Sequence, residues 1–241
     1  MFLGLYLILI LTALGSGMLV FFLKPGDQRA LKIMLAFSGA FLIGITFMEL
    51  VPEVFGHAGR FTGLFVLLGF LLQLFLELIT EGVEHGHKHD HSDHEKASPF
   101  LLLIGLSIHS FLEGMPIISG FDEHLLHTLV TGIVVHNLPI SLVLMSMFLH
   151  YGCSRTRAFL YLLVFSLMTP LGSLFSQVLD TAFSAAVETW FNYILAVVIG
   201  IFLHVSTSIL FEAEENHRYN LQKFITVLAG LALAIGLSMA D

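Results

Sequence analysis

Charged residues and cysteine are what this sequence has least of. Only 12% of the 241 residues are Asp, Glu, Lys or Arg, and just ten of these are basic. A chain with so few cations offers no basic surface for nucleic acid, so we expect no such partner. Cys153 is the single cysteine, which excludes a disulfide within the chain. The sequence also has no GxxxxGK[ST] segment, so no ATP-binding loop of that type is expected.

Apolar side chains, by contrast, are abundant. Hydrophobic residues make up 56% of the chain, and its mean hydropathy of +0.90 is far above that of ordinary soluble domains. A helix needs roughly 20 mainly apolar residues to span a bilayer, where it must satisfy its own backbone groups. The first apolar stretch is longer than that of a signal peptide, so we expect it to be retained as a helix. Eight stretches qualify, at about 1–23, 31–52, 61–80, 98–119, 126–149, 157–179, 187–212 and 222–240.

The sequence therefore predicts an all-α membrane protein, a bundle of eight transmembrane helices in a single domain over residues 1–241. Its basic residues are distributed unevenly among the linkers, because only Arg60 lies in an even-numbered one. By the positive-inside rule the odd-numbered linkers are cytoplasmic and both termini are extracytoplasmic. The basic residues in or beside the odd-numbered linkers are Lys24, Arg29, Lys32, Lys88, Lys96, Arg155, Arg157, Arg218 and Lys223.

Ionisable side chains near the middle of the predicted spans are few, and those of the fourth and fifth helices are of metal-ligand types. The stretch SIHSFLEGMPIISG places His109 and Glu113 at positions i and i+4, on one face of the fourth helix. His109 lies about 11 residues into that helix, at a depth of roughly 16 Å. The next helix runs in the opposite direction, and its HNLP segment places His136 about 10 residues in, or roughly 15 Å. The three side chains are thus expected at one depth near the middle of the membrane.

Two imidazoles and a carboxylate suit Zn²⁺ or a neighbouring first-row divalent ion, with at least one position left for water or another oxygen. A charged group at mid-membrane costs about 3 kcal/mol on insertion scales, so each one requires a partner or a function. A hydrogen-bonded structural network is the alternative interpretation. We favour a metal site because three ligand types coincide at one depth on adjacent antiparallel helices.

Other polar side chains lie near this predicted site or closer to the helix ends. Glu49 and Glu53 stand one helical turn apart at the outer end of the second helix, where we predict a cation entrance; a solvated helix end is the alternative. His204 lies about half-way along the seventh helix with no carboxylate within a turn, so a metal role is the less favoured interpretation there. Neutral oxygens inside the membrane come from Ser110, Asn137 and Thr169.

The linker between the third and fourth helices, at about 82–97, has its own composition. It lies within the segment EGVEHGHKHDHSDHEKAS, which mixes histidines with acids and has no cysteine. This pattern is typical of an exchangeable metal-binding tract rather than a rigid zinc finger, and a solvated linker is the alternative. On the predicted topology it is cytoplasmic. Its histidines are His85, His87, His89, His91 and His94.

Together these segments resemble the ZIP (Zrt/Irt-like protein) family of divalent metal transporters over nearly the whole chain. Four motifs occur in order: FMELVPE in the second helix, HSFLEG in the fourth, HNLP in the fifth and TPLG in the sixth. The eight helices, the external termini and the His-rich loop are similar as well. The resemblance implies a transport site between the fourth and fifth helices, in which His109, Glu113 and His136 match primary ligands. It also implies that the first three and last three helices form an inverted repeat.

Several neutral residues depart from the family pattern. Many relatives have a second metal position next to the first, bridged by acids. Here Ser110 stands where Asn is usual, Asn137 at a position that is often acidic, and Ile140 where a ligand often follows the proline. Thr169 precedes the sixth-helix proline, where some relatives place an acid. We therefore expect one well-formed metal position, with Ser110, Asn137 and Thr169 as a weak neutral neighbour.

The predicted function is ZIP-type uptake of a divalent cation, with Zn²⁺ as the expected substrate and no organic cofactor. We expect a multi-pass protein of the plasma membrane and consider a homodimer as its assembly. The rival is an intramembrane zinc-dependent hydrolase, which would use the same ligand types. Against this rival, HSFLE is not HExxH, and no spare carboxylate lies beside His136. A third alternative is a sensor that binds metal without moving it.

Overall fold

The computed structural model describes residues 2–22, 28–57, 59–80, 99–118, 123–182, 187–211 and 221–240. Within these ranges the fold is all-helical, with eight helical segments, as predicted. Seven of the segments are long and apolar enough to cross a membrane, and the segment that ends at Gly114 is shorter. The α-helices are α1 (Phe2–Met18), α2 (Gln28–Ile45), α3 (Val51–Gly56), α4 (Thr62–Ile79), α5 (Pro99–Gly114), α6 (Glu123–His150), α7 (Arg155–Ala182), α8 (Val187–Phe211) and α9 (Leu221–Ser238).

A π-helical turn over Thr46–Leu50 joins α2 to α3 in one continuous segment. The backbone N–H of Val51 donates to the carbonyl of Thr46, one residue further back than in an α-helix. Pro52 accounts for this wider turn, because proline has no N–H and its ring clashes with the carbonyl four residues earlier. The π-helical turn carries Glu49, so the irregular backbone lies at a predicted functional residue.

The fourth segment is shorter than predicted. The sequence indicated a helix over 98–119, but α5 ends at Gly114 and two tight turns follow, with Ile117 N–H donating to the Gly114 carbonyl at 3.0 Å. Pro116 is the cause, because it cannot donate to the helix and it disfavours helical geometry at Met115. The end of the helix thus lies one residue after Glu113.

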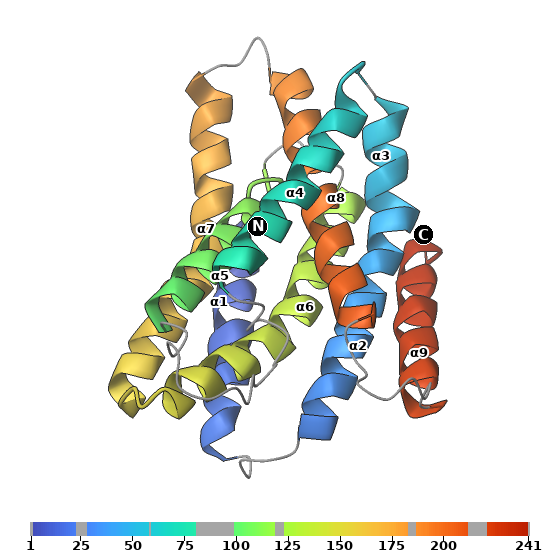
Figure 1. Cartoon of the computed structure of the whole chain (residues 1–241). Helices are drawn as coiled ribbons and strands as arrows, with labels where there is room; N and C mark the ends of the chain where they lie inside the picture. The colour runs from blue at the N-terminus through green and yellow to red at the C-terminus, as the bar shows by residue number, and fades with distance from the viewer. Residues whose placement is uncertain are drawn as a thin grey trace.

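The helices pack as two groups that meet along α2 and α6. One group contains α1, α5, α6 and α7; the other contains α2, α4, α8 and α9. Figure 1 shows α9 (red) beside α2, with α7 (gold) on the opposite side of the bundle. The larger core cluster joins the groups and includes the fully buried Phe41, Ile133 and Phe202. A second cluster, which includes Phe148 and Phe165, lies within the first group.

Glycines bring α5 and α7 into direct backbone contact. A Cβ atom at Gly114 would lie 1.9 Å from the carbonyl oxygen of Thr169, and one at Gly172 would lie 1.9 Å from that of Phe111. No side chain larger than hydrogen fits at either position without moving a helix backbone. Small residues of this kind allow close approach of membrane helices. The contact fixes the position of α5, and hence of His109 and Glu113, against α7.

Large apolar side chains cover much of the outer surface. Phe22, Leu78 and Leu221 are at least 70% exposed, and many other Leu, Ile and Phe side chains on the spans are about half exposed. In water such a surface would aggregate, whereas lipid solvates it. Together with the seven candidate spans, it identifies a multi-pass integral membrane protein.

Candidate metal centre

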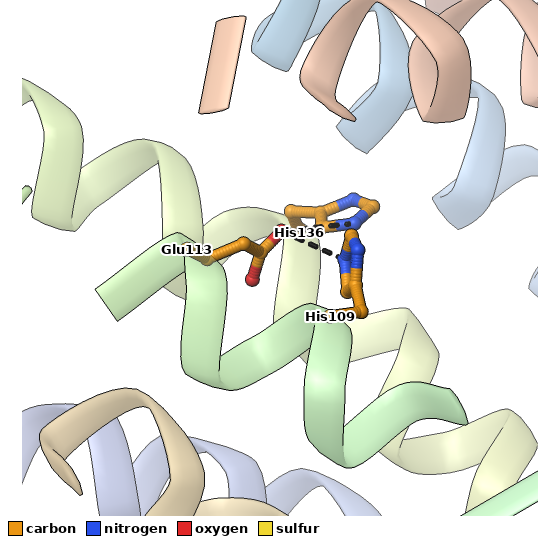
Figure 2. Close-up of side chains that lie close together, drawn as sticks. All are labelled: His109, Glu113 and His136. Atoms are coloured by element: carbon orange, nitrogen blue, oxygen red, sulfur yellow. Dashed lines mark ion pairs between the residues drawn. The ribbon is translucent and has the colours of Figure 1, made fainter. Parts of the chain in front are cut away.

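Two neighbouring helices supply the three predicted ligands. His109 and Glu113 lie one turn apart on α5, and His136 lies on α6, three residues before Pro139. Figure 2 shows Glu113 and His109 projecting from one helix toward His136 on the other. The equal depth that the sequence predicted for the two histidines agrees with this arrangement. The structure brings all three side chains together.

The ligand atoms are close enough to share one cation. His109 Nε2 lies 2.8 Å from Glu113 Oε1, and His136 Nε2 lies 3.8 Å from the same oxygen. The ring centroids of His109 and His136 are 5.9 Å apart, with the ring planes inclined at 67°. One ligand atom from each residue lies within 4.8 Å of the other two. Among the described residues, no other group of three or more His, Cys, Asp or Glu converges in this way.

The site is closed off from its surroundings. His109 is 1% exposed, and Glu113 and His136 are fully buried. In the part of the chain that the structure describes, the carboxylate of Glu113 contacts the two imidazoles and accepts no other hydrogen bond. A buried carboxylate left with only ion-pair contacts is costly, and a divalent cation held between it and two imidazole nitrogens would compensate for the burial. Three protein ligands would leave room in a tetrahedral shell for water or another oxygen.

Gln73 of α4 completes the surroundings of His109. The Nδ1 atom of His109 lies 2.9 Å from the amide oxygen Oε1 of Gln73, whose side chain is buried. Sequence reasoning missed this partner. The available signal was a strongly polar side chain in the middle of an apolar span, TGLFVLLGFLLQLFLELI, where an unpaired amide would be costly.

The residues of the predicted second position are only partly brought together. Ser110 Oγ and Thr169 Oγ1 are hydrogen-bonded at 2.7 Å, which joins α5 to α7 beside the Gly114 contact. One hydroxyl donates to the other, so each has a polar partner without a cation. Asn137 is buried on α6, and its Oδ1 accepts no hydrogen bond within the described ranges. A weak neutral neighbour to the first metal position stays a prediction.

The predicted entrance acids have separate partners. Glu49 accepts a hydrogen bond from Ser238 of α9, and its Oε1 lies 3.6 Å from His124 Nε2 at the start of α6. Glu53 instead lies 3.6 Å from His57 Nδ1, where both side chains are largely exposed. Glu49 is the more enclosed of the two acids, with its side chain 15% exposed. His124 is a further candidate entrance residue that the sequence reasoning missed, because α6 meets the π-helical turn only in the folded bundle.

A second buried histidine has a carboxylate partner that the sequence did not indicate. His204 Nε2 on α8 lies 3.4 Å from Glu77 Oε2 on α4, and Phe70 packs edge-on against the His204 ring at 4.8 Å between centroids. The absence of an acid within one turn of His204 along its own helix was therefore a poor guide to its surroundings. The predicted metal-binding loop, from His85 to His94, lies outside the described residues.

Comparison with known proteins agrees with this geometry. A family model described as ZIP Zinc transporter matches residues 85–238, which is more than half of the chain and includes all three candidate ligands. No curated protein matches the sequence.

Proposed function

The chain belongs to the ZIP zinc transporter family, and we propose that it moves Zn²⁺ into the cytoplasm through a site made by His109, Glu113 and His136. Members of this family are transporters and not enzymes, which removes the hydrolase alternative. The single observation that carries the proposal is the convergence of one carboxylate and two imidazoles, all buried, between α5 and α6.

The ligand set suits a cation that must both bind and leave. Imidazole nitrogen and carboxylate oxygen are ordinary Zn²⁺ ligands, and the absence of thiolates avoids the very tight sites of structural zinc. Glu113 supplies one negative charge against the two positive charges of the ion. Since Ser110, Asn137 and Thr169 are neutral, they would add no electrostatic trapping, and we expect faster release than from a two-metal site bridged by acids.

The rest of the route follows from the predicted topology. Glu49, Glu53 and His124 near the outer end of the bundle would collect cations, and the His-rich loop over 82–97 would receive them in the cytoplasm. Movement of one helix group against the other would open the buried site alternately to each side. We place the protein in the plasma membrane, because uptake from outside the cell is the direction that the topology predicts.

Transport by purified protein in liposomes tests the proposal. We expect vesicles containing the protein to accumulate radiolabelled Zn²⁺, and His109→Ala, Glu113→Gln and His136→Ala to lose that accumulation, because each substitution removes one of only three protein ligands. His150→Ala, at the exposed end of the same helix as His136, is the matched control and should transport normally.

Two results would contradict the proposal. Accumulation that persists in all three ligand variants would place the transport site elsewhere. Tight Zn²⁺ binding without accumulation, in protein shown to be correctly inserted, would favour a sensor over a transporter.

A further inference from the structure

We propose that Gln73 is a positioning residue of the metal site, which selects the nitrogen that His109 presents to the cation. This inference rests on the proposed function, because it concerns the same site. Gln73 comes from α4, whereas the three ligands come from α5 and α6. Its amide oxygen lies 2.9 Å from His109 Nδ1, and both side chains are 1% exposed.

The chemistry of the two atoms determines which of them donates the hydrogen bond. A carbonyl oxygen only accepts hydrogen bonds, so Nδ1 of His109 carries the proton and donates to Gln73 Oε1. In a neutral imidazole the other nitrogen, Nε2, then holds the lone pair. Nε2 is the atom that lies 2.8 Å from Glu113, on the side of the ring that faces the site. Gln73 therefore keeps the ligating lone pair of His109 pointed at the metal position.

The orienting partner of His109 comes from outside the group of three ligands. Gln73 supplies a side-chain acceptor at the ring nitrogen that points away from Glu113. Outer partners that orient a ligating histidine typically contribute about 10–100-fold to metal affinity. Because Gln73 lies on a helix that packs mainly against α8, its side chain can be changed without altering the α5–α7 contact.

Zn²⁺ affinity in a series of Gln73 variants tests the inference. The measurements use the full chain in lipid nanodiscs, with the five loop histidines replaced by serine so that loop binding does not contribute to the titration. Gln73→Met keeps the volume but removes the acceptor, and we expect affinity to fall by about 10–100-fold. Gln73→Glu keeps an acceptor oxygen and should restore affinity to within about threefold of the parent.

A matched control is available on α7. Gln177 is also an intramembrane glutamine, and its amide donates to Tyr6 and Ser173 at 2.6 and 3.2 Å, away from the three ligands. Gln177→Met should leave Zn²⁺ affinity unchanged. If Gln73→Met behaves like Gln177→Met while His109→Ala abolishes binding, the positioning role is wrong and the proposed site stands. If His109→Ala also leaves binding unchanged, the proposed site itself is wrong.

Nitrogen NMR of the Zn²⁺-loaded protein supplies a readout that does not depend on a variant folding. The His109 signal, assigned by its loss in His109→Ala, should show a protonated Nδ1 and a metal-bound Nε2. The opposite pattern would overturn the inference. So would a Gln73→Glu variant as weak as Gln73→Met, because the loss would then come from disturbed packing and not from the missing acceptor.

Discussion

Two regions of the described part of the bundle each place a buried histidine beside a carboxylate: the group of His109, Glu113 and His136, and the pair of His204 and Glu77. His109 and Glu113 are fully enclosed neighbours on one helix, and His136 adds a third candidate ligand from the next helix. His204 and Glu77 face each other from two helices, the carboxylate is 18% exposed, and no third ligand of His, Cys, Asp or Glu type converges on them in the described chain. A buried histidine beside an acid is therefore weaker support for a metal site than three converging residues of ligand types. The number of converging ligands separates the two cases.

Helix α4 contributes to both pairs. Gln73 faces His109. Glu77, which lies one turn further along the same helix, faces His204. Residues four apart share a helix face, so one polar face of α4 contacts a candidate ligand in one helix group and a histidine in the other. Each contact gives a buried imidazole a polar partner from α4.

Replacing one histidine from each region should produce the largest difference, which is a difference in Zn²⁺ affinity between the two variants. In the chain with the loop histidines replaced, we expect His136→Ala to weaken Zn²⁺ binding by more than about 100-fold, beyond the cost of losing an outer partner. His204→Ala should change it by less than about threefold, because among the described residues His204 does not converge with the three candidate ligands. Isothermal titration calorimetry measures both. Equal losses in the two variants would show that the pair at His204 belongs to the metal pathway.

Adding a carboxylate beside the group of His109, Glu113 and His136 should have an intermediate effect on metal binding. Ile140 lies one turn after His136 on α6, on the same face of the helix, and is buried. Ile140→Glu should create a charged second position and raise the number of bound Zn²⁺ ions by one per chain relative to Ile140→Gln. Metal analysis after dialysis counts the ions. The same count in both variants would show that ligand charge is not what the second position lacks.

The pair of His204 and Glu77 should contribute mainly to the free energy of unfolding. This is the smallest of the expected effects. Removing one partner of a buried ion pair leaves the other uncompensated, so the double variant Glu77→Ala/His204→Ala should be more stable than additivity predicts, by about 1–2 kcal/mol. Reversible denaturation in detergent measures the free energies of unfolding. The exposed pair Glu53 and His57 is the control, with coupling expected near zero. Equal coupling in both pairs would mean that burial does not distinguish them.

The sequence alone was sufficient for the class of protein and for the three candidate ligands. The length of the apolar stretches predicted eight helical segments, and the i, i+4 spacing of His109 and Glu113 predicted a shared helix face. The hydrophobicity of the sequence did not predict the early end of α5. A hydrophobicity pattern continues through Ile117 and Ile118, and only the backbone constraints of Pro116 end the helix before them.

The tertiary structure decided which side chains from other helices become partners. The contacts of Gln73 with His109, Glu77 with His204 and His124 with Glu49 each join residues far apart in the sequence. Spacing along one helix follows from its fixed pitch, so the sequence determines which residues share a face. Which face meets which neighbour depends on the rotation and close packing of whole helices, which here includes the direct backbone contact at Gly114 and Gly172. For this protein the sequence thus determined the membrane class and the types of the candidate ligands, and only the packed bundle decided how those side chains are held.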